Sequence, residues 1–136
     1  MLNRSGISKT TLTATRQILA NVELQSSVGC IVPQALGVTV GTKKIAKAGT
    51  PINIDLLNLQ TAVKKPAAAQ SEPATAAVPM NAVLLHDVDV TNGNANGTAL
   101  YFGVVNVNRV ESDVASAITA AVAIDGKSPL IVFIKA

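Results

Sequence analysis

The chain has 136 residues and a net charge of +3, and its residues are 49% hydrophobic, 14% charged and 2% aromatic. This length and apolar content suit one domain with an aliphatic core and argue against global disorder. The scarcity of aromatic residues argues against stacking surfaces for single-stranded nucleic acid or sugars. One cysteine and one histidine exclude an internal disulfide, a multi-cysteine metal site and motifs that need two histidines.

The first 27 residues differ in texture from the rest, being rich in Ser, Thr, Asn and Gln with scattered apolar residues. Thr occupies four of the six positions 10–15, which favours extended backbone. A short helical face is the alternative for the four apolar residues Ile18, Leu19, Val22 and Leu24. We expect residues 1–27 to be an extended N-terminal arm that orders on a partner. No signal-peptide pattern is present, so we expect synthesis in a reducing cytoplasm.

A β-rich body is expected over residues 28–136. Residues 29–32 predict a strand ended by the proline that follows, and residues 36–40 predict a second strand. The sequence Ala-Gly-Thr-Pro at 48–51 indicates a turn. Residues 52–55 then alternate apolar and polar side chains, which is the period of a strand.

Residues 66–79 have the sequence PAAAQSEPATAAVP, which contains three prolines and only one apolar residue larger than alanine, Val78. Such a segment can bury little surface. We therefore expect an exposed Ala/Pro-rich loop or linker.

The strongest β pattern lies between residues 82 and 110. Residues 82–90 end in strict alternation of Asp and Val, residues 91–97 carry an Asn-Gly pair at each end, and residues 98–110 form a second apolar run. Two β runs joined by an Asn/Gly-rich segment predict a hairpin, although seven residues exceed the favoured two.

One helix is expected near the C-terminus. Ser112 is a candidate N-cap, and the helix dipole favours an acidic residue such as Asp113 in the first turn. Apolar residues between 114 and 122 fall on one helical face, and Asp-Gly at 125–126 is a stop signal. Residues 130–134, LIVFI, predict a final strand, so the predicted fold class is mainly β with one short helix.

Oxygen-bearing side chains cluster at Asp87, Asp89, Asn92, Asn94 and Asn96, which raises the possibility of a calcium loop. The EF-hand pattern requires Gly at its sixth position and Glu at its twelfth, where this chain has Asn92 and Thr98. The solvent face of a strand followed by a turn explains the same residues. We expect no metal ion.

Candidate catalytic residues are also weak. His86 and Asp87 are adjacent, and neighbours on a strand point to opposite faces. Cys30 lies in an apolar strand pattern with no nucleophile-elbow sequence around it, which indicates a small buried residue. We expect no enzyme, no catalytic residues and no cofactor.

Charge is unevenly distributed along the chain. Residues 1–65 carry eight Lys/Arg against two acids, a balance of +6, and residues 66–136 carry three against six, a balance of −3. Ordinary surface solvation is one interpretation, and a basic N-terminal portion that meets an acidic partner is the other. No basic run exceeds two lysines and no aromatic residues are interleaved, so direct nucleic-acid binding is not expected. No stretch of about 20 apolar residues is present, so no membrane partner is expected.

Three blocks of the sequence resemble the head decoration (cement) proteins of tailed bacteriophages, the broad group that includes the lambda decoration protein. They are KKIAKAGTPINIDLLNLQTA at 43–62, NAVLLHDVDVTNGNANGTALYFGVVNVNRV at 81–110 and LIVFIKA at the C-terminus. Together they cover roughly half of the chain, mainly as spaced β texture, and none is a catalytic signature.

The resemblance implies a compact β-tulip body that sits as homotrimers on the outer surface of an expanded icosahedral capsid. It also implies an N-terminal arm that adds β structure to the major capsid protein and holds the coat lattice against DNA pressure. In this chain the arm residues expected to contact the coat are Leu12, Arg16, Ile18, Val22 and Leu24. Strand addition of this kind gains affinity from main-chain hydrogen bonds, and many copies on a lattice make modest individual affinities sufficient.

Two other functions remain open from the sequence. One is a different structural part of a virion or cell surface, such as a fibre base or adhesive module, which a linker between two folded parts at 66–79 would favour. The other is a small hydrolase or ligand-binding β-barrel, which would need a pocket around His86 and Asp89.

Overall fold

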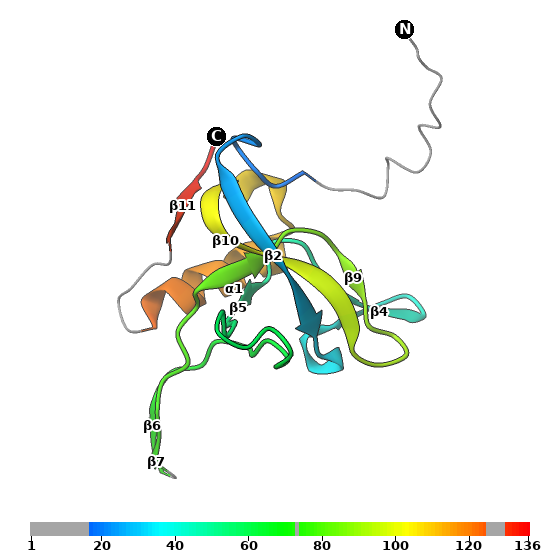
Figure 1. Ribbon diagram of the computed structural model, residues 1–136, viewed down its shortest axis with the longest axis vertical. Helices are drawn as coiled ribbons and strands as arrows, with labels where there is room; N and C mark the ends of the chain where they lie inside the picture. The colour runs from blue at the N-terminus through cyan, green and yellow to red at the C-terminus, as the bar shows by residue number, and fades with distance from the viewer. Residues whose placement is uncertain (1–16, 73, 125–129) are drawn as a thin grey trace, which may run out of the picture.

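The computed structural model describes residues 17–72, 74–124 and 130–136. Within these ranges the strands form a five-stranded sheet, a three-stranded sheet and a two-stranded hairpin, and one α-helix packs against the main sheet (Figure 1). The predicted fold class, mainly β with one short helix, is therefore confirmed.

The main sheet is organised around β10 (Ala95–Asn106), which pairs along both of its edges. β2 (Gln25–Val32) runs antiparallel along one edge. β8 (Ala82–Leu84) and β11 (Leu130–Ile134) share the other edge, β8 antiparallel and β11 parallel to β10. β5 (Pro51–Ile52) extends the sheet beyond β8. The strand predicted at 52–55 is shorter than expected: β5 ends at Ile52, and the next residue, Asn53, forms an isolated antiparallel bridge with Lys64.

The boundary expected after residue 27 is wrong, because the body begins at least ten residues earlier, at Ile18. Ile18 is 0% and Leu19 is 2% exposed, and both belong to the main hydrophobic core. The backbone around Leu19 pairs antiparallel with Val105, beyond the point where β2 ends its contact with β10. Residues 18–20 thus supply the hydrogen bonds that this end of β10 needs. Residues 1–16 of the expected arm lie outside the described residues.

A second sheet contains β3 (Val38–Val40), β4 (Lys43–Ala46) and β9 (Val88–Asp89), in that order. The predicted strand at 36–40 is only partly correct. Its first residue ends a 3-10 helix, η2 (Gln34–Leu36), and β3 begins after the following glycine. Pro33 was expected to end the strand that precedes it. It does, since β2 ends at residue 32.

The predicted strand at 82–90 is divided between the two sheets. β8 pairs with β10 and β9 pairs with β4, so the chain crosses from one sheet to the other at residues 85–87. The crossing is held by Asp87, whose Oδ1 accepts a hydrogen bond from the backbone N–H of Ala48 at 2.7 Å. The hairpin prediction is only partly correct. β8 and β10 do pair antiparallel, with Leu84 opposite Ala99, but β9 of the other sheet lies between them in the chain, and the turn predicted at 91–97 overlaps the start of β10.

The helix α1 (Ser112–Ala123) covers one face of the main sheet and buries Val114, Ile118 and Ala121. Its N-cap is Glu111 rather than the predicted Ser112, which is the first helical residue. The start of the helix is instead held by Lys47. The Nζ of Lys47 lies 3.0 Å from Oδ2 of Asp113 and 3.6 Å from Oε1 of Glu111. The stop predicted at 125–126 lies outside the described residues.

The Ala/Pro-rich segment forms a narrow hairpin that projects from the body (Figure 1). It contains β6 (Gln70–Ser71) and β7 (Ala74–Thr75), and Ala67 pairs with Val78 at its base. Residues 67–72 and 74–76 are exposed, and the residues at the base of the hairpin, Pro66, Ala77, Val78 and Pro79, are partly buried, so most of the described segment is exposed, as expected for 66–79. The strands on either side of the hairpin, β5 and β8, are neighbours in one sheet, so the segment does not link two separate bodies.

Candidate interaction surfaces

The residues expected to contact a coat subunit fall into three groups. Leu12 and Arg16 lie outside the described residues. Ile18 is fully buried in the body and is therefore not available to a partner. Val22 and Leu24 are 54% and 48% exposed, in the segment that connects the anchored residues 18–20 to β2.

The anchor at residues 18–20 is held by backbone and side-chain bonds to one end of β10. The backbone N–H of Ala20 donates to the carbonyl oxygen of Val104 at 2.9 Å, and the N–H of Asn106 donates to the carbonyl of Ile18 at 2.9 Å. The guanidinium of Arg109 donates to the carbonyl of Leu19 at 2.9 Å. These bonds fix the point from which the N-terminal residues extend.

The C-terminus is held at the same end of β10. The side chain of Asn106 is 4% exposed, and its Oδ1 accepts hydrogen bonds from the backbone N–H groups of Asn108 and Ala136. The side-chain amide of Asn108 in turn donates to the carbonyl oxygen of Ala136 at 3.2 Å. One buried polar side chain therefore joins the C-terminus to the strand that also anchors the N-terminal segment.

Three of the five side chains of the calcium-loop pattern, those of Asp87, Asp89 and Asn94, accept hydrogen bonds from other parts of the protein. Asp89 accepts bonds from the hydroxyl and the N–H of Thr91, and these bonds lower the pKa of Asp89. Asn94 Oδ1 accepts a bond from the N–H of Gln34 at 3.1 Å. In the described ranges, no group of three or more His, Cys, Asp or Glu side chains is arranged to hold a metal ion. The residues of this region shape a turn and attach it to η2.

The candidate catalytic residues do not share a site. The side chains of His86 and Asp87 are both exposed, and Asp87 holds the crossing between the two sheets as described above. Cys30 is buried on β2 in the core between the two sheets, as expected. Burial raises the pKa of the Cys30 thiol, which disfavours the reactive thiolate.

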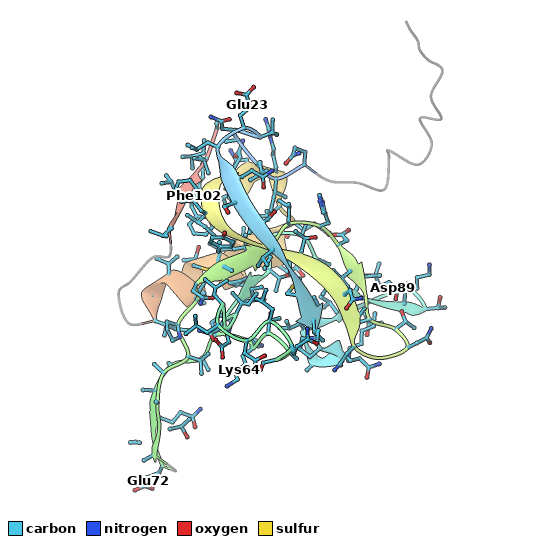
Figure 2. All side chains as sticks on the ribbon, viewed as in Figure 1. Glu23, Lys64, Glu72, Asp89 and Phe102 are labelled. Carbon is cyan, nitrogen blue, oxygen red and sulfur yellow. The ribbon has the colours of Figure 1, made fainter. Side chains whose placement is uncertain are left out.

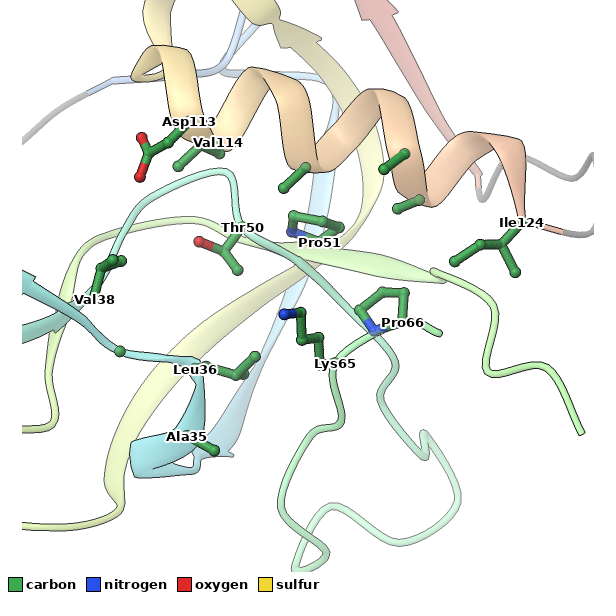
Figure 3. Close-up of a pocket in the computed structure, with 14 residues that line it drawn as sticks. Ala35, Leu36, Val38, Thr50, Pro51, Lys65, Pro66, Asp113, Val114 and Ile124 are labelled. Carbon is green, nitrogen blue, oxygen red and sulfur yellow. The ribbon is translucent and has the colours of Figure 1, made fainter. Parts of the chain in front are cut away.

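An apolar groove of about 420 Å³ lies between α1, β5 and η2 (Figure 3). Its floor is aliphatic, with Leu36, Pro51 and Val114 among the residues that line it, and Asp113 and Lys65 contribute the charged groups. The ion pair with Lys47 lowers the pKa of Asp113, so this carboxyl group stays ionised and tied to the β4–β5 turn. The groove can accept apolar side chains.

Within the part of the first half that the structure describes, the lysines are spread over several elements. Lys43 and Lys44 lie on β4, Lys47 is paired with the helix N-terminus, and Lys64 lies on the lower side of the body in Figure 2. These four lysines therefore do not all lie on one element, and one of them, Lys47, is paired with the acids at the start of α1.

No protein-family model, no curated protein and no solved structure matches the chain. No helix in the described part of the chain is long and apolar enough to cross a membrane.

Proposed function

We propose that this chain is a structural virion protein that binds the outside of an expanded bacteriophage capsid, as homotrimers, and stabilises the coat lattice. The proposal rests first on the resemblance of residues 43–62, 81–110 and 130–136 to head decoration proteins. The observation that supports it most is the anchor at residues 18–20. This anchor attaches a 16-residue, Thr-rich N-terminal segment to the end of a β sheet, where it can add a strand to a coat subunit.

The structure also gives a physical role to the Ala-Gly-Thr-Pro block. The N–H of Gly49 donates to the carbonyl of Leu84, and the N–H of Leu84 donates to the carbonyl of Thr50, at 2.7 and 3.0 Å. These bonds join the β4–β5 turn to β8, while Lys47 joins the same turn to the helix. The resembling residues of this block therefore stabilise the body, and the proposed coat contact is assigned to the arm.

A fibre base or adhesive module is the alternative function. A linker at 66–79 would have favoured it, but that segment is a hairpin between neighbouring strands of one sheet. The alternative therefore loses the feature that would have distinguished it.

Two N-terminal deletions separate coat binding from folding. Deletion of residues 1–16 leaves every described residue in place, so the body should stay folded while binding to expanded capsid shells is lost. Deletion of residues 1–27 also removes Ile18 and Leu19 from the core, and loss of one such side chain costs about 2–5 kcal/mol. The longer deletion should therefore destabilise or unfold the body.

The experiment adds each purified protein to expanded shells that lack this chain, sediments the shells and measures the bound fraction. Circular dichroism gives the melting temperature of each protein. A folded 17–136 fragment that saturates shells as the full chain does would contradict the role of the arm. Failure of the full chain to bind shells would contradict the proposed function itself.

A further inference from the structure

The edge of the main sheet at β11 is unusually apolar for an edge strand. Among the described residues β11 pairs with β10 alone, so the backbone groups on its other side have no strand partner there. Its five residues are Leu, Ile, Val, Phe and Ile. Natural edge strands are commonly protected by a charge, a proline, a bulge or a covering segment, and β11 carries no charge or proline within its length. An edge of this composition is a template for another strand.

Beside this edge the sheet carries four apolar side chains on the face away from α1, three of them exposed and the fourth, Val104, partly buried. The register places Leu130 beside Phe102 and Val132 beside Val104, and alternation along both strands puts the four on one face. The intervening residue Ile131 is buried in the core that α1 covers. Leu130, Val132 and Phe102 are 70%, 59% and 37% exposed. We call these four residues the outer patch.

The outer patch lies at the end of the body where the N-terminal segment is attached. β11 pairs with residues 102–106 of β10, and residues 18–20 pair with residues 104–106 on the opposite edge of the same strand. Figure 2 shows Phe102 and Glu23 toward this end of the molecule, whereas Lys64 and the hairpin tip at Glu72 lie toward the other end. The described anchor at residues 18–20, to which the proposed arm is joined, is therefore separated from the outer patch by one strand, β10.

We propose that the outer patch and the edge of β11 that has no strand partner among the described residues form a second docking site, which receives an extended strand of the coat protein. This inference rests on the proposed function, because attachment of the arm at this end makes it the end that faces the coat. The incoming strand would pair its backbone with β11 and place apolar side chains, at every second position, on the outer patch. The arm and the body would then bind the coat at two linked sites, and binding at one site would raise the effective affinity at the other.

The test uses the full chain with Val132→Glu, which puts a charge in the middle of the edge strand, and Leu130→Glu as a second variant. Leu57→Glu is the matched control, because Leu57 is 98% exposed on a loop far along the chain from β11. Both test positions are exposed, so melting temperatures should stay close to that of the unchanged protein. We expect Val132→Glu and Leu130→Glu to weaken binding to expanded shells at least about tenfold, equivalent to 1.4 kcal/mol, while Leu57→Glu binds normally.

Hydrogen exchange provides a readout that a purely structural role would not change. Strand addition should slow exchange of the β11 amides when the full chain is bound to shells. Unchanged exchange at β11 together with normal shell binding by both variants would overturn the inference while leaving the proposed function intact. Failure of the unchanged chain to bind shells would remove the function and the inference together.

A second copy of the chain is the competing occupant of this edge. Sedimentation velocity of the free proteins distinguishes it. An oligomer that Val132→Glu dissociates, with shell binding by the resulting monomer unimpaired, would assign the edge to contacts between copies and overturn the proposal.

Discussion

Substitution of Gly49 by alanine tests why the Ala-Gly-Thr-Pro turn has its sequence. Gly49 has a φ of +89°, and a Cβ added there would lie 2.6 Å from Cγ1 of Val110 and 3.2 Å from Cγ1 of Val114. Both valines are buried between the turn, the sheet and α1. The variant therefore faces two costs: about 1–2 kcal/mol for left-handed backbone and about 1–3 kcal/mol for overpacking.

Gly41 provides the matched control, since it also has a positive φ, +63°, but a Cβ there would meet nothing within 4 Å. Loss of chain freedom in the unfolded state offsets about 0.4–1 kcal/mol of the cost at both positions. We therefore expect the free energy of unfolding to fall by about 1 kcal/mol for Gly41→Ala and by about 2–4 kcal/mol for Gly49→Ala.

Urea unfolding followed by circular dichroism measures both changes. At a chain of this size, about 1 kcal/mol corresponds to about 3–4 °C in melting temperature. Equal destabilisation of the two variants would show that Val110 and Val114 move aside, and would refute the argument from close approach. Folded Gly49→Ala should still bind shells at low temperature, because the turn is assigned to the body and not to the coat contact.

Three further predictions concern the ion pair, the hairpin and the cysteine. Lys47 lowers the pKa of Asp113, so the ion pair contributes stability above the unfolded pKa of about 3.9, and this stability is lost as pH falls through the lower folded pKa. Asp113→Asn should therefore lower the free energy of unfolding by less than about 1 kcal/mol at pH 7. In thermal melts near pH 2 the variant and the unchanged protein should have the same stability. A persistent difference at pH 2 would show that charge is not the cause. Replacement of residues 68–77 by Asn-Gly, which keeps the pairing of Ala67 with Val78, should change the melting temperature by less than about 3 °C and leave shell binding intact; loss of binding would place a coat contact on the hairpin. Cys30 is buried and its thiol pKa is raised, so a thiol reagent should label it slowly in the native protein and fully in urea; rapid native labelling would contradict its burial.

Local patterns in the sequence predict the elements whose burial repeats with a regular period. The alternation at 87–90 correctly places Val88 and Val90 inside and Asp87 and Asp89 outside. The helical spacing of Val114, Ile118 and Ala121 likewise predicts the buried face of α1, and the apolar run at 130–134 predicts β11.

Long-range contacts decide the parts that the sequence did not predict. Ile18 and Leu19 are two apolar residues in a polar stretch, and only the paired end of β10 and the core under α1 make them part of the body. The division of 82–90 into two strands likewise depends on a hydrogen bond between Asp87 and Ala48, 39 positions apart. The outer patch was missed for the same reason, since Phe102 and Leu130 become neighbours only when β11 pairs with β10.

The most direct test of the proposed function is the copy number of this chain in purified particles from its source. Quantitative mass spectrometry against the most abundant coat protein gives the ratio. A lattice-wide decoration protein predicts a ratio near one to one. A few copies per particle would assign the chain to a vertex, fibre or tail, and its complete absence from particles would contradict a role in the virion.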